Sequence, residues 1–438
     1  MNLQELCRRI TIQHFRICAG LSYDSNKLKF YEKQLAQLSK EKIKKVKDEH
    51  FKLWLIGKIA NYAEHDLYME QIKERAKLFF DDVTYANWRS WLSKSNSNDR
   101  KKVFDYFMKK SNKIKNIVKK RFSKIDDVYK RYGYSVLDAY LLKENLQYER
   151  LVKKISKIGE KNKSMFDRIW KFLNVEKEYW NEYYYLRSIV FKNVVFTKEP
   201  LCEIKKLFKG LGFDFSRIKV DDKDRKEKFC YAYCFWPNPP KDVRVLYKPV
   251  EGYNLFLTVF HEFGHAAHAI SMNEKLPFWK RFGVQSGVAE TFSLLFESIG
   301  KEKNYLKSIG ACDEMLVKLA KLSDSIFLAF YSANSLVKLM FWNNEISFDE
   351  LGKTYSKLLE EYTGLSMPED YWIYHHILSE YSIYAPSYIV AYIRMNKLSS
   401  ILRNRYGSRW WGSKYAGRYL KQIMSLGYDA IKTFKNMI

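Results

Sequence analysis

Residues that interrupt helices are scarce in the first half of this chain. The 438 residues include only 18 glycines and 8 prolines, and no proline occurs before Pro200. Because glycine and proline are the strongest local breaks in a helical pattern, this scarcity predicts a mostly all-α fold. Apolar residues at helical spacing, with lysine on the other face, predict a helix over 101–122 and a long helix over 159–191. We place the N-cap of the first of these at Asp99.

One stretch, residues 230–252, departs from the helical pattern. It is rich in tyrosine, valine and proline and contains Pro239-Pro240, which predicts one or two short strands around a proline turn. We therefore expect a boundary near residue 200. An N-terminal helical lobe would cover 1–200, and a second helical domain would cover 201–438 and carry a β-ribbon at about 229–250. No fixed-period repeat is present, which argues against a solenoid.

The net charge of +27 has two explanations. A basic surface can bind nucleic acid. However, the lysines and arginines are spread along the chain and fall mostly on the polar sides of amphipathic patterns. Lysine, tyrosine, phenylalanine, isoleucine and asparagine are all abundant, as AT-rich codon usage would produce. We therefore favour a composition bias and expect no nucleic-acid partner.

The apolar segments and cysteines bear on the compartment. No window approaches 18 uninterrupted apolar residues, so we expect no membrane span. Glu5, Arg8 and Arg9 fall where a signal peptide would need an apolar block. The six cysteines form no paired framework of the kind that secreted domains use. These observations favour a cytoplasmic protein.

The stretch HEFGHAAH, residues 261–268, holds three of the eight histidines. His261 and His265 are four apart, so on a helix both imidazoles project from one face, as one zinc ion requires. Glu262 beside them is a candidate general base toward a metal-activated water, without being a ligand itself. The alternative is a pair of core histidines hydrogen-bonded inside a bundle. His268, one turn further on, is either a second-shell or a structural residue, and we favour the structural reading.

A second apolar helix, expected at 287–300, supplies the third ligand. Glu290 lies in the middle of an apolar run, where a carboxylate is costly unless it is paired or binds metal. We therefore predict a site for one Zn²⁺ per chain, held by His261, His265 and Glu290. Ser293 and Glu297 follow on the same face and are second-shell candidates that could orient a ligand imidazole. Their alternative role is a buried hydrogen-bonding stripe.

A third cluster, residues 374–392, sets two histidines among five tyrosines. Hydrolysis of a peptide at zinc builds negative charge on the former carbonyl oxygen, and a tyrosine hydroxyl or an imidazole can stabilise it. The alternative is a tyrosine-rich core in a chain with 33 tyrosines.

Together these three segments resemble the thimet oligopeptidase / oligoendopeptidase F family of zinc metallopeptidases. HEFGHAAH is similar to the family's H-E-x-G-H-x-x-H, and VAETFSLLFE (288–297) to its segment with the third ligand. The resemblance, which covers the chain from about residue 229, selects His376, Tyr381 and Tyr388 from the H-x4-Y-x6-Y pattern as catalytic residues. It implies a two-lobed helical fold around a deep cleft. It also implies hydrolysis of internal bonds in short, unstructured peptides, with the β-ribbon holding the substrate backbone as an added strand.

The chain departs from the family in being shorter and in having Pro386 where some relatives have glycines, so Tyr381 is expected to be less mobile. One alternative is a helical zinc carboxypeptidase of the carboxypeptidase Taq type, which shares the first motif and a downstream glutamate. A more distant one is a basic nucleic-acid-binding protein with a structural zinc. A structural site, however, has no need of Glu262.

Overall fold

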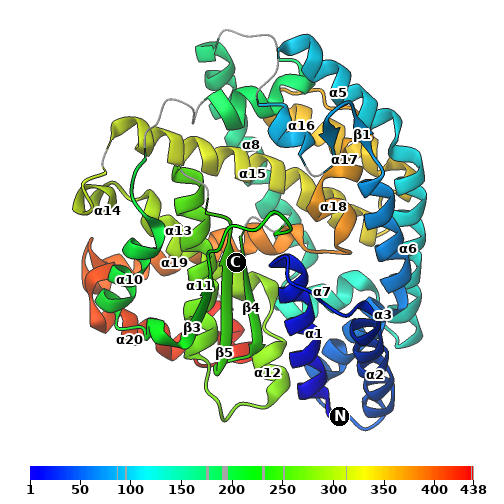
Figure 1. The fold of residues 1–438 in the computed structure, drawn as a ribbon, viewed down its shortest axis with the longest axis vertical. Coiled ribbons are helices and arrows are strands. Elements are labelled where there is room, and N and C mark those ends of the chain that lie inside the picture. The colour runs from blue at the N-terminus through cyan, green and yellow to red at the C-terminus, as the bar shows by residue number, and fades with distance from the viewer. Residues whose placement is uncertain are drawn as a thin grey trace. The chain divides into compact units, whose positions relative to one another are not determined.

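The computed structural model describes residues 1–85, 87–93, 96–173, 177–189, 196–228, 232–249, 252–311, 313–435 and 437 (Figure 1). It is 73% helical with only 5% strand. The mostly all-α fold expected from the scarcity of glycine and proline is therefore confirmed.

The chain folds into two compact units, each assembled from separate stretches of sequence. The first consists of Met1–Ile59, Val194–Lys318 and Val390–Ile438, and the second of Ala60–Asn193 and Leu319–Ile389. The expected division at residue 200 differs from this arrangement, since each unit takes residues from both halves of the chain. Three of the four divisions fall inside helices, α3 (Glu49–Ala76), α15 (Glu314–Trp342) and α19 (Ala385–Tyr406), so no loop marks those three. The fourth, between Asn193 and Val194, lies near the expected boundary.

The first unit contains a small sheet and the helices around it. Besides its parts of α3, α15 and α19, its elements are α1 (Leu3–Cys18), α2 (Ser25–Ile43), α10 (Pro200–Leu211), η3 (Phe215–Arg217), β3 (Ile218–Asp221), β4 (Ala232–Asn238), β5 (Asp242–Tyr247), α11 (Tyr253–Ser271), α12 (Phe278–Phe282), α13 (Ser286–Lys301), α14 (Lys303–Ser308), η5 (Trp410–Gly412), α20 (Lys414–Met424) and η6 (Gly427–Phe434).

The described part of the second unit contains helices and one hairpin of two short strands. Besides its parts of α3, α15 and α19, its elements are β1 (Phe79–Phe80), β2 (Val83–Thr84), α4 (Trp88–Trp91), α5 (Ser97–Lys109), α6 (Ser111–Arg131), α7 (Val136–Glu144), α8 (Tyr148–Leu173), η1 (Tyr179–Asn181), the π-helical turn η2 (Tyr184–Ile189), η4 (Phe348–Glu350), α16 (Leu351–Thr363), α17 (Tyr371–Tyr374) and α18 (His376–Glu380).

The three-stranded sheet has the order β3-β5-β4. Strands β4 and β5 form the antiparallel ribbon predicted from the sequence, whose expected residues 229–231 and 250 lie outside the described chain. Strand β3 pairs in parallel with β5 and was not predicted. Figure 1 shows the sheet beside α11, and β4 forms one edge.

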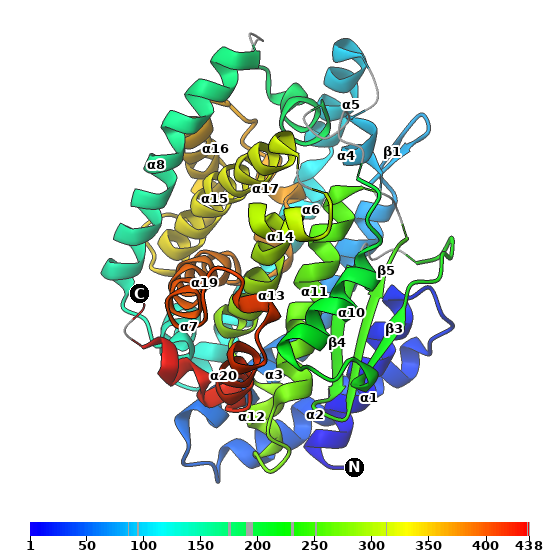
Figure 2. The same cartoon turned by 90° about the vertical axis from the view of Figure 1, so that its left-hand side faces the viewer.

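Side chains alternate across β4, as they do in any strand. On one face Phe235 is buried against Phe15 of α1, with ring centroids 5.6 Å apart. On the other face Trp236 packs against α11, and its ring centroid lies 5.4 Å from that of His268. Helix α11 in turn lies along α13, as the side view shows (Figure 2). The motif helix is thus fixed between the edge strand and the helix that carries Glu290.

Two helix predictions in the second unit were wrong in their bounds. The predicted helix over 101–122 is two helices, α5 and α6, separated at Lys110, and the N-cap is Asn96, whose side chain accepts from the backbone N–H of Asp99. The predicted helix over 159–191 ends at Leu173, where α8 ends. A 3-10 turn and a π-helical turn follow within the described residues up to 189.

Helix α15 has the length and hydropathy of a membrane-spanning helix. Its 18-residue window has a mean hydropathy of 1.2, but 78% of that window is buried in the protein. Core helices pass the same length and hydropathy test, so within the described chain this helix is weak evidence for a span.

Candidate metal centre

Three side chains from α11 and α13 converge on one point in the first unit. Nε2 of His261 lies 3.2 Å from Oε2 of Glu290, and Nε2 of His265 lies 3.5 Å from the same oxygen. One ligand atom from each residue lies within 4.8 Å of the others. The predicted set of His261, His265 and Glu290 is therefore brought together as a group that could hold a metal ion.

The spacing of these atoms fits zinc. Ligand atoms about 2.0–2.1 Å from a tetrahedral ion are about 3.3 Å from one another. The two histidine-to-glutamate distances of 3.2 and 3.5 Å bracket that value. Two imidazole nitrogens and one carboxylate oxygen are also a donor set that leaves a tetrahedral position for water or substrate. These three residues alone would therefore leave a fourth position of a tetrahedral ion unfilled.

The imidazole of His261 is held from behind by Glu297. Its Nδ1 lies 2.9 Å from Oε2 of Glu297, two turns along α13 from Glu290. A proton on Nδ1 donated to this carboxylate leaves the lone pair of Nε2 free for a metal. The other oxygen, Oε1, is 2.6 Å from Nζ of Lys301. The contact expected between Glu297 and a ligand imidazole is present, and Lys301 is an addition that the sequence did not suggest.

Glu290 is also oriented by a neighbour. Oγ of Ser293 donates to Oε2 of Glu290 at 2.9 Å, and it is 3.0 Å from the backbone carbonyl of the same residue. Both residues are buried, with exposed fractions of 3% for Glu290 and 0% for Ser293. A buried carboxylate is retained only where such partners compensate its lost hydration. Ser293 thus fixes the carboxylate in the position that faces the two histidines.

The electrostatics of the cluster favour a cation. Burial by itself would lower the pKa of His261, but hydrogen bonds with Glu290 and Glu297 outweigh it and raise that pKa well above its usual value. Burial would likewise raise the pKa of Glu290, but His265 and His261 hold it well below the usual range. For Glu297, Lys301 and His261 overcome burial and lower the pKa to about 2. The site therefore keeps its carboxylates ionised and attracts positive charge.

Glu262 stands beside the cluster and outside the ligand set. It is partly buried, and burial raises its pKa above the usual value, against the opposing charges of His261 and His265. The backbone of Cys234, on the edge strand β4, has a smaller lowering effect on the same pKa. A raised pKa makes the carboxylate a better proton acceptor than an ordinary glutamate, which suits a general base.

His268 makes no contact with the ligand group that would orient it. Both ring nitrogens are buried without a hydrogen-bond partner in the described chain, and burial lowers its pKa to about 3. The ring packs against Trp236 and Phe292, with centroids 5.4 and 4.6 Å away. A neutral imidazole surrounded by aromatic rings supports the structural reading of His268 over a second-shell role.

Gly264, inside the histidine motif, allows α11 and α13 to approach. A Cβ at this position would lie 2.6 Å from both the carbonyl oxygen of Phe292 and Cα of Ser293. Those atoms belong to the turn of α13 that follows Glu290, so any side chain at 264 would push the third ligand away. A glycine in the middle of an amphipathic helix was visible in the sequence. The close contact between α11 and α13 gives the reason for it.

The other predicted residues belong to the second unit. Tyr381 follows α18 and is 39% exposed, and its ring lies 5.0 Å from that of Tyr384. Tyr388 is partly buried in α19, with its ring 5.0 Å from that of Tyr331. His376 begins α18, but its side chain lies outside the described part of the structure. Their association with the metal centre remains a prediction.

His375, the other histidine of the pair, is a core residue. It is 5% exposed, and its Nε2 lies 3.3 Å from Nδ2 of Asn334 on α15. The choice of His376 as the candidate catalytic histidine stays a prediction.

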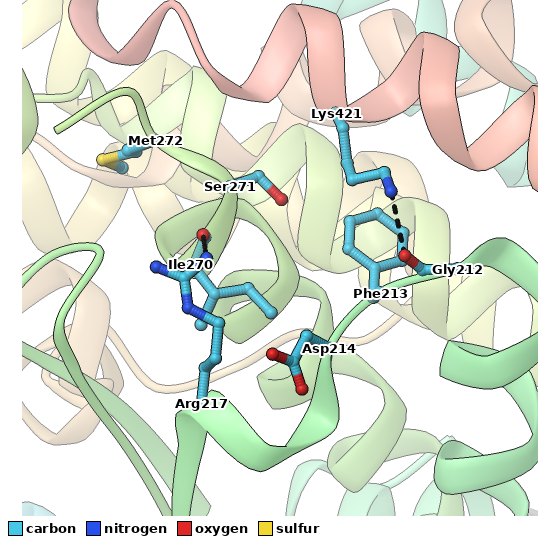
Figure 3. Close-up of a pocket in the computed structure, with 8 residues that line it drawn as sticks. All are labelled: Gly212, Phe213, Asp214, Arg217, Ile270, Ser271, Met272 and Lys421. Atoms are coloured by element: carbon cyan, nitrogen blue, oxygen red, sulfur yellow. Dashed lines mark hydrogen bonds between the residues drawn. The ribbon is translucent and has the colours of Figure 1, made fainter.

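A cavity of about 280 Å³ lies at the C-terminal end of α11, and none of the predicted site residues lines it (Figure 3). Its two cations are already engaged. Arg217 donates from Nη1 to the carbonyl of Ile270 at 2.9 Å, and Lys421 from Nζ to the carbonyl of Gly212 at 2.9 Å. These bonds join η3 and α20 to neighbouring backbone, so the cavity is a recess between packed elements.

Comparison with known proteins adds no assignment: neither the models of protein families nor the curated protein sequences match this chain.

Proposed function

We propose that this protein is a zinc-dependent oligopeptidase that hydrolyses internal bonds of short, unstructured peptides. The observation that carries the proposal is the convergence of His261, His265 and Glu290, with Glu262 beside them and not among the ligands. A purely structural metal site has no use for a proton acceptor next to its first histidine. The open position implied by three protein ligands is where substrate and water would meet.

The residues of the chain divide the work as follows. A zinc ion at this site would supply Lewis acidity toward the peptide carbonyl and would acidify the attacking water. Glu262 takes the proton from that water and passes it to the leaving amine. Glu297 and Ser293 keep His261 and Glu290 in their metal-facing orientations.

The family resemblance assigns roles to three further residues and to the sheet. Tyr388, with His376 or Tyr381, would donate hydrogen bonds to the oxyanion. The strand β4, which forms an edge of the sheet, would hold the substrate backbone as an added strand.

The direct test is cleavage of a short peptide panel read by mass spectrometry, with the protein as purified, chelated, and reloaded with zinc. We expect cleavage that chelation abolishes and zinc restores. Including peptides blocked at the C-terminus separates the alternatives: an endopeptidase cuts them, and a carboxypeptidase of the Taq type does not. Absence of metal-dependent cleavage across the panel would overturn the proposal.

Glu262→Gln tests the assigned general base. The variant should bind zinc like the wild type and lose turnover by a factor of about 10² to 10⁴. Glu302→Gln is the matched control, because Glu302 is also partly buried but pairs with Arg403 away from the ligands. Full turnover in a zinc-loaded Glu262→Gln protein would remove Glu262 from this role.

A further inference from the structure

In the second unit, four consecutive backbone carbonyls are bound by side chains from other helices. The carbonyl of Ser379 accepts from Nη1 of Arg121 at 3.0 Å, and that of Glu380 accepts from Nη2 of the same guanidinium at 2.7 Å. The next two accept from α15: Tyr381 O from Nζ of Lys338 at 3.0 Å, and Ser382 O from Nε1 of Trp342 at 2.7 Å. We call residues 379–382 the anchored segment.

The donors are buried and therefore costly. Arg121 and Lys338 are each 1% exposed, and Trp342 is 8% exposed. Burial, reinforced by the charge of Arg121, lowers the pKa of Lys338 well below its usual value. The last carbonyls of a short helix such as α18 can be satisfied by water or a glycine cap at far lower cost. In some proteins buried ionic groups are retained because they fix one conformation, and here they would fix the position of the anchored segment.

A further cation, Arg75 on α3, holds the same segment from its side chains. It pairs with the carboxylate of Glu380 at 2.6 Å and donates to the carbonyl of Ile373 at 3.1 Å. Arg121 is itself fixed by Glu64, whose Oε2 lies 2.8 Å from its Nε. The anchored segment is thus held by residues of α3, α6 and α15 together.

One face of α15 organises the rest of the histidine–tyrosine region. The residues on this face follow one another at helical spacing. Phe327 and Tyr331 pack on Tyr388, and Asn334 contacts His375. Further along the same face, Lys338 and Trp342 bind the anchored segment. Helix α15 therefore contacts both Tyr388 and the segment that carries Tyr381, the tyrosines expected to act on substrate.

We propose that Arg121, Lys338 and Trp342 are positioning residues that hold the anchored segment so that Tyr381 and the tyrosines after it present their hydroxyls in one arrangement. This inference rests on the proposed function, since it assigns these residues to the same reaction. They do not touch substrate, and they act through the backbone of residues 379–382. Their loss should therefore reduce kcat and leave KM and zinc affinity unchanged.

Two variants with matched controls test it. Trp342→Phe removes one N–H donor, and Trp372→Phe makes the same truncation at a buried indole whose Nε1 has no hydrogen-bond partner in the described chain. Lys338→Met removes the ammonium, and Lys321→Met makes the same change at an exposed position of α15. For each pair we would measure kcat and KM on a quenched peptide, and amide hydrogen exchange of residues 379–384.

We expect Lys338→Met to lower kcat about tenfold or more with KM within about twofold, and to speed exchange in 379–384. Trp342→Phe should act in the same direction, and neither control should do so. Unchanged exchange in both variants, or unchanged kcat in an active enzyme, would overturn the inference. If the wild type cleaves no peptide, the proposed function fails, and the exchange comparison alone still decides whether the segment is anchored.

Discussion

Nδ1 of His261 lies 2.9 Å from Oε2 of Glu297, so the histidine that faces Glu290 with one nitrogen is held by a second glutamate through the other. Both glutamates lie on α13, seven residues apart, and both face α11. One helix thus supplies a candidate ligand and the group that orients another ligand.

Glu297→Gln should weaken zinc binding about 10- to 100-fold. The amide can still accept a hydrogen bond from His261, but it carries no charge to support the imidazole or to balance Lys301. Competition with a chromophoric chelator measures the dissociation constant, and Glu302→Gln is again the control. Equal zinc affinity in the wild type and Glu297→Gln would show that this contact does not support the metal.

Gly264→Ala should destabilise the fold by about 1–3 kcal/mol, because overpacking forces neighbouring backbone to move. The displaced atoms are those of Phe292 and Ser293, so zinc affinity should fall together with stability. Denaturant unfolding and chelator competition measure the two effects. Gly412→Ala is the control, since a Cβ there meets nothing within 4 Å and stability should be retained. A variant as stable as the wild type would contradict this account of the helix contact.

His268→Leu should retain zinc binding, and His265→Leu should abolish it. The two histidines are three residues apart, but the ring of His268 lies among aromatic rings and finds no hydrogen-bond partner among the described residues. An apolar side chain of similar size therefore suits its surroundings. Metal content after dialysis, measured by atomic absorption, compares the variants directly. Loss of zinc from a folded His268→Leu protein would place His268 in the metal site after all.

Local sequence was sufficient for the parts of the site that depend on one helix. Residues four apart on α11 determine that His261 and His265 share a face, and a carboxylate within an apolar run identified Glu290. The partners of Glu290 and His261 on α13 were also accessible, because helical spacing places Ser293 and Glu297 on the same side. The ribbon was predictable because its composition differs from everything around it.

Contacts between distant segments were not predictable in the same way. Asp99 was expected as a cap and Asn96 is the cap, three residues earlier, because both residue types suit that role. The break between α5 and α6 coincides with a hydrogen bond of 2.6 Å from Ser111 to Asp370, which lies 259 residues away. Strand β3 is only four residues long and is a strand because it pairs with β5. The division of the chain into two interleaved units was not predictable either, because it also depends on contacts between distant segments.

Lys301 has a consequence for which ions the metal centre can hold. A metal ion bound to His261 would replace the proton that its raised pKa favours, and both ligand imidazoles would then be neutral. With Glu262, Glu290 and Glu297 ionised and Lys301 charged, the net charge of the side chains would be −2, which one dication cancels. A monovalent ion would leave the buried cluster negative, and a trivalent ion would leave it positive. Uncompensated charge is costly away from water, so charge balance favours a divalent ion. The chemistry of the ligands then determines which divalent metal binds best.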